Sequence, residues 1–193
     1  MVPVSLQDLV SGAANLFLAS GNKTAMYAAG LIKSASPQRA ADPPRRLPVL
    51  QHLESITLPR LEADYDSLVS NLAPQLPWTD GNFALPDEIR GRNAFAELVG
   101  PEGPFLCQHC RFGFYLQAPD CLYPAHSHAA EEFYLILSGS AEWRLDGAEP
   151  FIPSVPGLVH HRPWQKHEMG TRRFPLLAMW AWVGDISYAT YSI

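Results

Sequence analysis

The sequence predicts an α+β fold in which a helical N-terminal region, residues 1–100, precedes a small antiparallel β-barrel, residues 101–193. Before Gly100, apolar residues recur three and four positions apart, which is the spacing of an amphipathic helix. After Gly100, short apolar or alternating runs are separated by Gly, Pro and Asp, which is typical of closely spaced antiparallel strands. We therefore expect helices first and strands second.

Helical patterns occupy most of the first half. Residues 2–20 predict one helix, with Ser5 as its N-cap, and residues 23–35 predict a second. Further helices are expected at about 49–56, 60–72 and 87–99. Residues 36–48 form a connector rich in proline and arginine, and its adjacent prolines cannot continue a helix. Its arginines are interpreted as a solvated surface rather than an anion site: Arg39, Arg45 and Arg46.

Six strands are expected in the second half, at 105–117, 132–137, 141–145, 158–161, 176–183 and 186–191. In the fifth of these, Trp180 and Trp182 share one face, and Leu177, Met179, Ala181 and Val183 share the other. One face should line the barrel and the other should pack against helices or a partner chain, and the pattern leaves open which is which.

The composition excludes several classes of protein. Hydrophobic residues make up 47 % of the 193 residues, which is enough for a substantial core. The net charge of -5 argues against a nucleic-acid binder, which usually has a basic face. No apolar run reaches the ~18 residues of a membrane span, and the N-terminus lacks the pattern of a signal peptide. Three cysteines fit a reducing compartment, so we expect a cytoplasmic protein without nucleic-acid or membrane partners.

The stretch from residue 126 to residue 139, HSHAAEEFYLILSG, contains a metal-site pattern. On an uninterrupted strand, side chains at even positions would share one face. Such a face would carry four chemically useful groups: His126, His128, Glu132 and Tyr134. Nitrogen and oxygen ligands without a thiolate suit a divalent transition metal. A fourth ligand should come from downstream, where three histidines compete: His160, His161 and His167.

This pattern resembles the cupin superfamily. The first cupin motif, two histidines, a glutamate and a glycine, is matched by His126, His128, Glu132 and Gly139. The second motif is approximated by Gly157, Pro163 and His167, one residue short of the usual spacing. The resemblance therefore implies His167 as the fourth ligand, with His160 or His161 as alternatives. The usual leading glycine of the first motif is absent, because Asp120 stands in its place.

Within the cupins, residues 105–186 resemble the dimethylsulfoniopropionate lyases of the DddQ type. In that family a tyrosine two residues after the metal glutamate is the catalytic base, and it corresponds to Tyr134. A second active-site tyrosine corresponds to Tyr123, and a late tryptophan corresponds to Trp182. The resemblance implies that a small zwitterionic substrate is cleaved by β-elimination to dimethyl sulfide and acrylate. It also implies one divalent ion, Fe²⁺, Zn²⁺, Mn²⁺ or Co²⁺, and aromatic contacts from Tyr123, Trp180 or Trp182 to the sulfonium.

Other interpretations stay open. The same ligands could serve a non-haem iron dioxygenase or an isomerase acting on a small carboxylate. A non-catalytic sensor is disfavoured, because no helix-turn-helix module or basic patch accompanies the barrel. The sequence Cys107-Gln108-His109-Cys110 superficially resembles a zinc or redox site, but strand alternation would place its two cysteines on opposite faces. The helical half could cover the barrel or form a homodimer interface.

Overall fold

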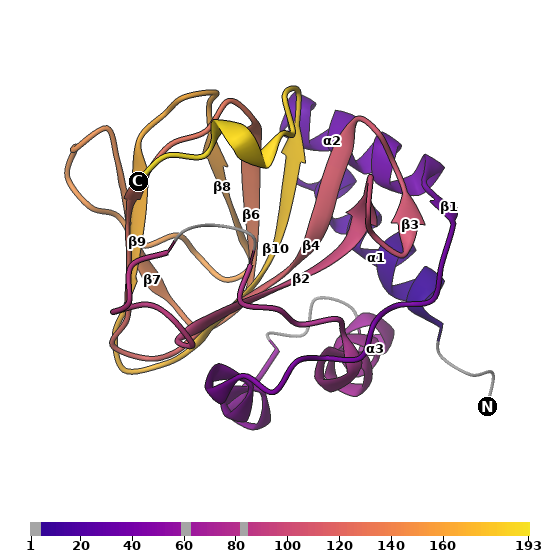
Figure 1. Ribbon diagram of the computed structural model, residues 1–193, viewed down its shortest axis with the longest axis horizontal. Helices are drawn as coiled ribbons and strands as arrows, with labels where there is room; N and C mark the ends of the chain where they lie inside the picture. The colour runs from indigo at the N-terminus through magenta and orange to yellow at the C-terminus, as the bar shows by residue number, and fades with distance from the viewer. Residues whose placement is uncertain (1–4, 59–62, 82–84) are drawn as a thin grey trace.

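Two β-sheets face each other in the computed structural model, which describes residues 5–58, 63–81 and 85–193 (Figure 1). The larger sheet has the strand order β1-β3-β2-β4-β10-β6-β8, and the smaller has the order β5-β9-β7. The strands are β1 (Ser36–Pro37), β2 (Asn93–Gly100), β3 (Phe105–Leu106), β4 (Cys110–Gln117), β5 (Leu122–His126), β6 (Glu131–Ser138), β7 (Ala141–Leu145), β8 (Gly157–His161), β9 (His167–Thr171) and β10 (Leu176–Val183). The predicted α+β class, with helices first and strands second, is confirmed.

Two helices begin the described chain. Helix α1 (Leu6–Ala19) starts with a capping box between Ser5 and Asp8, so Ser5 is the N-cap as predicted. Helix α2 (Lys23–Ser34) begins at Asn22, whose side chain accepts hydrogen bonds from two backbone amides. Figure 1 shows both helices beside the larger sheet. The remaining helical segments are η1 (Pro48–Ser55), α3 (Ala63–Leu72), η2 (Ala73–Gln75) and η3 (Tyr188–Thr190).

The apolar interior is divided into two clusters by the larger sheet. One cluster lies between the helices and the sheet, and it contains the odd-numbered face of β10, including Met179 and Ala181. The other fills the barrel and is rich in aromatic residues, Trp180 and Trp182 among them. The tryptophan face of β10 therefore lines the barrel, which answers the question that the sequence pattern left open.

Two predicted elements are wrong. Residues 87–99 were expected to form a helix, but strand β2 begins at Asn93 and pairs with β4. Its alternation is clear once the sheet is known, because Phe95 faces the barrel while Ala94 and Ala96 face the helices. Pairing along β4 outweighs the local helical preference of this stretch. Residues 186–191 were expected to be a strand, but they contain the short 3-10 helix η3, capped by Ser187.

Other boundaries differ in smaller ways. The expected strand 105–117 is broken by bends into β3 and β4. The expected helix 49–56 is a 3-10 helix, and the predicted start of the helix 60–72 lies outside the described residues. Strands β5 and β9 were not predicted at all. Strand β2 also places a strand of the larger sheet on the N-terminal side of residue 101, where the barrel region was expected to begin.

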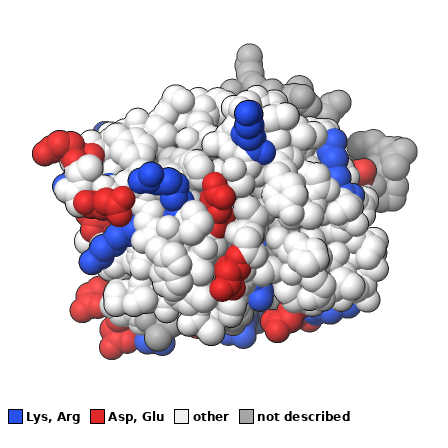
Figure 2. All heavy atoms as spheres, turned by 90° about the horizontal axis from the view of Figure 1, so that it is seen from above, with Lys and Arg blue, Asp and Glu red and all other residues white. Residues whose placement is uncertain are grey.

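The surface carries both signs of charge. On the face shown in Figure 2, acidic and basic side chains are interspersed and are separated by broad uncharged areas. None of the helices in the described ranges combines the length and the apolar character needed to cross a membrane.

We predict that the turn between β6 and β7 depends on Gly139. Its φ is +82°, and a Cβ there would lie 1.8 Å from the carbonyl oxygen of Pro175. Gly147 has a similar φ of +73°, but nothing lies within 4 Å of its Cβ position. Both Gly→Ala changes incur the left-handed backbone cost of about 1–2 kcal/mol, and only Gly139→Ala adds a clash of about 1–3 kcal/mol. Urea unfolding should show the larger loss for Gly139→Ala, and equal losses would contradict the predicted clash.

Candidate metal centre and its cavity

Four buried side chains bring donor atoms together inside the barrel: His126, His128, Glu132 and His167. Their ligand atoms all lie within 4.8 Å of one another. His126 ends β5 and is paired in register with His167, the first residue of β9. Glu132 comes from β6 in the other sheet. The cluster therefore connects the two sheets across the barrel interior.

The expectation of one uninterrupted strand from His126 to Tyr134 is wrong. Strand β5 ends at His126, His128 lies in the connection, and β6 begins at Glu131 in the larger sheet. The four side chains still converge, because the connection carries the chain from one sheet to the facing one. The expectation that even-numbered side chains share one face holds only within β6, where Glu132 and Tyr134 both point into the barrel.

Each of the three histidines in the cluster binds a backbone carbonyl through Nδ1. A carbonyl oxygen can only accept, so Nδ1 carries a hydrogen in each ring, and in the neutral form of each ring Nε2 keeps a lone pair. This is the tautomer in which a histidine ligates a metal through Nε2, with its other nitrogen held by an outer partner. The acceptor is always two residues away: Pro124 for His126, Ala130 for His128 and Gln165 for His167, at 2.8, 3.1 and 2.8 Å.

Glu132 lies at the centre of the hydrogen-bond network. Its Oε1 accepts from the indole Nε1 of Trp182 at 2.6 Å, and its Oε2 accepts from Nδ1 of His161 at 2.9 Å. Nε2 of His128 and Nε2 of His167 lie 3.3 and 3.2 Å from the same Oε2. Burial by itself would raise the pKa of Glu132, but the neighbouring His128 and the hydrogen bonds hold this pKa well below its usual range. Glu132 is therefore an ionised, acceptor-only group.

The donor set fits a divalent transition metal. Three imidazole nitrogens and one carboxylate oxygen are suitable ligands for such ions. Nε2 of His167 is buried and makes no hydrogen bond, although Glu132 is near. This nitrogen is therefore available to bind a metal ion. Burial, followed by the proximity of His167, holds the pKa of His126 well below its usual value. His126 is therefore neutral and able to coordinate a metal.

The two alternative histidines have other contacts. His160 lies on the outward side of β8, where its Nε2 is 2.7 Å from Glu131 and its ring stacks on Phe133. His161 faces inward, but its Nδ1 donates to Glu132 and its ring stacks on His167 at a centroid distance of 3.8 Å. Burial, with His167 nearby, lowers the pKa of His161 to about 3. Within the described residues, the cluster of four donors thus contains His167 and neither alternative.

Tyr134 and Tyr123 line the same cavity as two members of the cluster, His126 and Glu132. Tyr134 is two residues beyond Glu132 on β6 and is almost completely buried. Burial and, next, the Glu132 carboxylate raise its pKa well above the ordinary value. The ring of Tyr123 lies 4.6 Å from that of His126, and its hydroxyl is 2.7 Å from the hydroxyl of Tyr191. Both phenol groups therefore share the cavity with His126 and Glu132.

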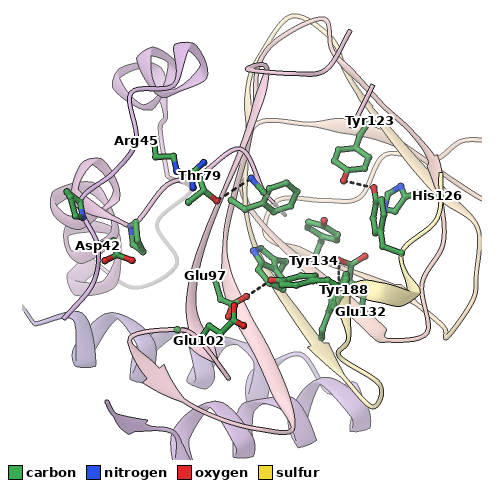
Figure 3. A pocket seen from close by; sticks show the side chains of 18 of the residues that line it. Asp42, Arg45, Thr79, Glu97, Glu102, Tyr123, His126, Glu132, Tyr134 and Tyr188 are labelled. Atoms are coloured by element: carbon green, nitrogen blue, oxygen red, sulfur yellow. Dashed lines mark hydrogen bonds between the residues drawn. The ribbon is translucent and has the colours of Figure 1, made fainter. Parts of the chain in front are cut away.

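The cavity has a volume of about 410 Å³ and extends well beyond the cluster. In Figure 3, Tyr123 and His126 lie at one end, and Asp42 and Arg45 lie at the opposite end. Arg45 and Arg39 are exposed and form ion pairs with Asp80 and Asp42, in keeping with a solvated connector. Both arginines also line the cavity, which the sequence interpretation did not anticipate.

Several cavity residues were missed by the sequence analysis. Tyr191 packs against His126 at 5.0 Å between ring centroids, and Phe95 lies beside Trp180 at 6.4 Å. Both belong to segments whose predicted secondary structure was wrong, so no local signal placed them in the barrel. Tyr188 is a third, and its ring lies 5.6 Å from that of Trp182.

A buried ion pair supports the wall that Tyr188 forms. Arg111 binds both oxygens of Glu97 at 3.0 and 2.9 Å, and its Nε donates to the carbonyl of Ile186 at 2.9 Å. The Tyr188 hydroxyl donates to Glu97, and the Arg111 guanidinium lies 3.9 Å above the Tyr188 ring. Burial raises the pKa of Glu97 and Arg111 opposes that effect. This network attaches the chain after β10 to β2 and β4.

Comparisons with known proteins point to one enzyme family. The family model described as dimethylsulfoniopropionate lyase matches residues 23–178. The chain is 31 % identical to DddL of Cereibacter sphaeroides, assigned as a dimethylsulfoniopropionate lyase, over 80 % of this chain and 67 % of that protein. It is 33 % identical to the dimethylsulfoniopropionate lyase DddQ of Ruegeria pomeroyi over 48 % of this chain and 46 % of that protein. The crystal structure of that DddQ superposes with a TM-score of 0.80 at 25 % identity, covering 100 % of this chain and 97 % of the other.

We predict that His167 is needed for metal binding and His160 is not. His167→Ala removes one of the four clustered donors, so the purified protein should contain much less Fe²⁺, Zn²⁺, Mn²⁺ or Co²⁺ after loading. His160→Ala removes an outward-facing ring and should retain about one equivalent. Elemental analysis of folded protein, checked by circular dichroism, measures both. Full metal content in His167→Ala would refute the assignment.

We also predict that Trp182 tunes metal affinity through Glu132. Trp182→Phe removes the indole N–H that orients Oε1, and loss of such an outer partner weakens metal binding by about 10- to 100-fold. Trp180→Phe is the matched control, because the Trp180 indole donates to the Phe114 carbonyl instead. A competition titration against a chelator gives both dissociation constants. Equal affinities for the two variants would show that the hydrogen bond has no such role.

Proposed function

Because the chain belongs to the dimethylsulfoniopropionate lyase family, we propose that it cleaves dimethylsulfoniopropionate in the barrel cavity, with Tyr134 as the catalytic base. The products of the cleavage are dimethyl sulfide and acrylate. The observation that carries the assignment of the base is the position of Tyr134. It is the phenol that follows Glu132 on the inward face of β6, and it lines the same cavity as His126 and Glu132, two of the four donors.

The residues that would hold the metal are the clustered donors: His126, His128, Glu132 and His167. When bound, a divalent cation supplies Lewis acidity toward the substrate carboxylate and favours the phenolate form of a nearby tyrosine. The donor set is compatible with Fe²⁺, Zn²⁺, Mn²⁺ and Co²⁺, and it does not discriminate among them. The other polar atoms of these ligands already have protein partners. Nδ1 of each histidine binds a backbone carbonyl, and Oε1 of Glu132 accepts from the Trp182 indole.

Tyr134 would accept the proton from the carbon next to the substrate carboxylate. The electron pair of that C–H bond then forms the C=C bond of acrylate, and the C–S bond breaks with its electrons leaving on dimethyl sulfide. The burial that raises the pKa of Tyr134 makes its phenolate a strong base. The same burial disfavours the phenolate, so a nearby positive charge would be needed to form it. The base is therefore competent only in the metal-loaded protein.

Aromatic side chains would bind the sulfonium end of the substrate. Trp180 and Trp182 line the cavity from β10, and Tyr123 lines it from β5. A cation over such a ring gains ~0.5–2 kcal/mol. Glu97 also lines the cavity, but its charge is balanced by Arg111, so the aromatic faces are the better candidates. The hydrogen bond between Tyr123 and Tyr191 would hold Tyr123 in place.

The alternative is another metal enzyme on the same fold, a dioxygenase or an isomerase. The same four donors would serve it, and the family match favours the lyase. The two functions differ in their need for oxygen, because an elimination consumes none. Cytoplasmic localisation and a homodimer stay predictions, and the three free cysteines agree with a reducing compartment.

We predict that Tyr134→Phe abolishes dimethyl sulfide release while retaining the metal. Loss of a general base reduces turnover by about 10²–10⁴-fold. Tyr115→Phe is the matched control, since the Tyr115 hydroxyl binds Gln117 at 2.6 Å and is not part of the cavity lining. Headspace dimethyl sulfide from metal-loaded protein is the measurement, with and without oxygen.

Three outcomes of this assay bear on the proposal. No dimethyl sulfide from the wild type under any of the four metals would reject the lyase function. Full activity in Tyr134→Phe would remove Tyr134 as the base. Activity that requires oxygen would favour the dioxygenase.

A further inference from the structure

His161, the last residue of β8, contacts two of the four clustered donors at once. Its Nδ1 donates to Oε2 of Glu132 at 2.9 Å. Its ring stacks on that of His167, with 3.8 Å between the centroids and an angle of 20° between the planes. Glu132 belongs to the larger sheet and His167 to the smaller one. One fully buried side chain therefore joins donors that come from both sheets.

The hydrogen bond from His161 goes to the oxygen of Glu132 that faces the other donors. Nε2 of His128 and Nε2 of His167 lie 3.3 and 3.2 Å from Oε2, whereas Oε1 accepts from the Trp182 indole. Each oxygen of an ionised carboxylate has two lone pairs. Oε2 can therefore accept from His161 and still offer a lone pair to a metal, and the contact with His161 sets the direction of that second lone pair.

The other ring nitrogen of His161 takes no part in this contact. The Glu132 carboxylate can only accept, so Nδ1 of His161 carries a hydrogen. Nε2 of His161 is buried and has no hydrogen-bond partner among the described residues. The contact with Glu132 thus depends on Nδ1 alone. An asparagine side chain can place an N–H near the position of Nδ1, whereas the longer glutamine places its amide near the position of Nε2.

The chain between His161 and His167 also supports the cluster. The backbone N–H of Trp164 donates to the carbonyl of His128 at 2.7 Å, and the carbonyl of Gln165 accepts from Nδ1 of His167 at 2.8 Å. His161 ends β8 and His167 begins β9, so the stack of their rings joins the two ends of this connection. Loss of the His161 ring would therefore remove one of the supports of His167.

We propose that His161 is a positioning residue of the metal centre, which fixes Oε2 of Glu132 and the ring of His167 for a divalent transition metal. The inference rests on the proposed metal binding and not on the reaction that the metal serves. In the described part of the chain, His161 is not one of the four clustered donors, so its loss should act through the geometry of the others. Loss of an outer partner of this kind weakens metal binding by about 10- to 100-fold.

Three substitutions of His161 separate its hydrogen bond from the bulk of its ring. His161→Leu removes the donor, His161→Asn keeps an N–H near Nδ1, and His161→Gln moves the amide away from Glu132. A competition titration against a chelator should show a Zn²⁺ dissociation constant about 10- to 100-fold higher in His161→Leu and His161→Gln. His161→Asn should recover most of the lost affinity. His160→Leu is the matched control, because the His160 ring stacks on Phe133 outside the barrel, and it should bind as the wild type does.

A cobalt spectrum gives a second readout, which a general loss of stability would not change. Co²⁺ suits the same donors, and its visible absorption depends on their number and arrangement. At saturating Co²⁺, the spectrum of His161→Leu should differ from that of the wild type, and the spectrum of His161→Asn should resemble it. Circular dichroism checks that each variant is folded. If His161→Leu does not fold, the comparison of His161→Asn with His161→Gln provides the same test.

Two results would overturn the role of His161 alone. One is equal metal affinity in the wild type and His161→Leu, and the other is an equal loss of affinity in His161→Asn and His161→Gln. A wild type that binds none of Fe²⁺, Zn²⁺, Mn²⁺ and Co²⁺ would reject this role together with the metal centre. The titration and the spectrum need no substrate, so failure of the proposed lyase function would be recognised separately.

Discussion

Glu132 is a carboxylate in the interior of the barrel, and burying it requires hydrogen-bond donors from several strands. Two of them supply these donors: Trp182 on β10 and His161 on β8. Trp182 and His161 are also the residues directly opposite Glu132 in the two neighbouring ladders. A slip of one residue in either ladder would turn a donor away from the carboxylate. The buried charge therefore specifies the register of β6, and with it the position of Tyr134.

The strands that could be predicted are those with a local signal. The expected strands 132–137, 141–145, 158–161 and 176–183 correspond to β6, β7, β8 and β10. Each is a short apolar or alternating run bounded by turn residues. Strand β2 has no such signal, because Asn93 to Gly100 also carries apolar residues at helical spacing. Only its pairing with β4, which is distant in sequence, decides between the two structures.

The residues of the candidate site also fall into those that the sequence could predict and those that it could not. His126, His128 and Glu132 follow from a compact sequence motif, because spacing along the chain determines how the connection from β5 to β6 places them. Tyr191 and Phe95 could not be predicted, since packing between segments far apart in the sequence brings them to the barrel.

The connector that lines the far end of the cavity is separate in sequence from the clustered donors. Asp42 and Arg45 lie on the opposite side of the cavity from His126 (Figure 3), in a proline-rich segment that contributes none of the four clustered donors. Mutations there can reshape that end of the cavity and leave the clustered donors untouched. The far end of the cavity and the clustered donors thus lie on separate parts of the chain, so exchanging the connector would alter one without replacing the other.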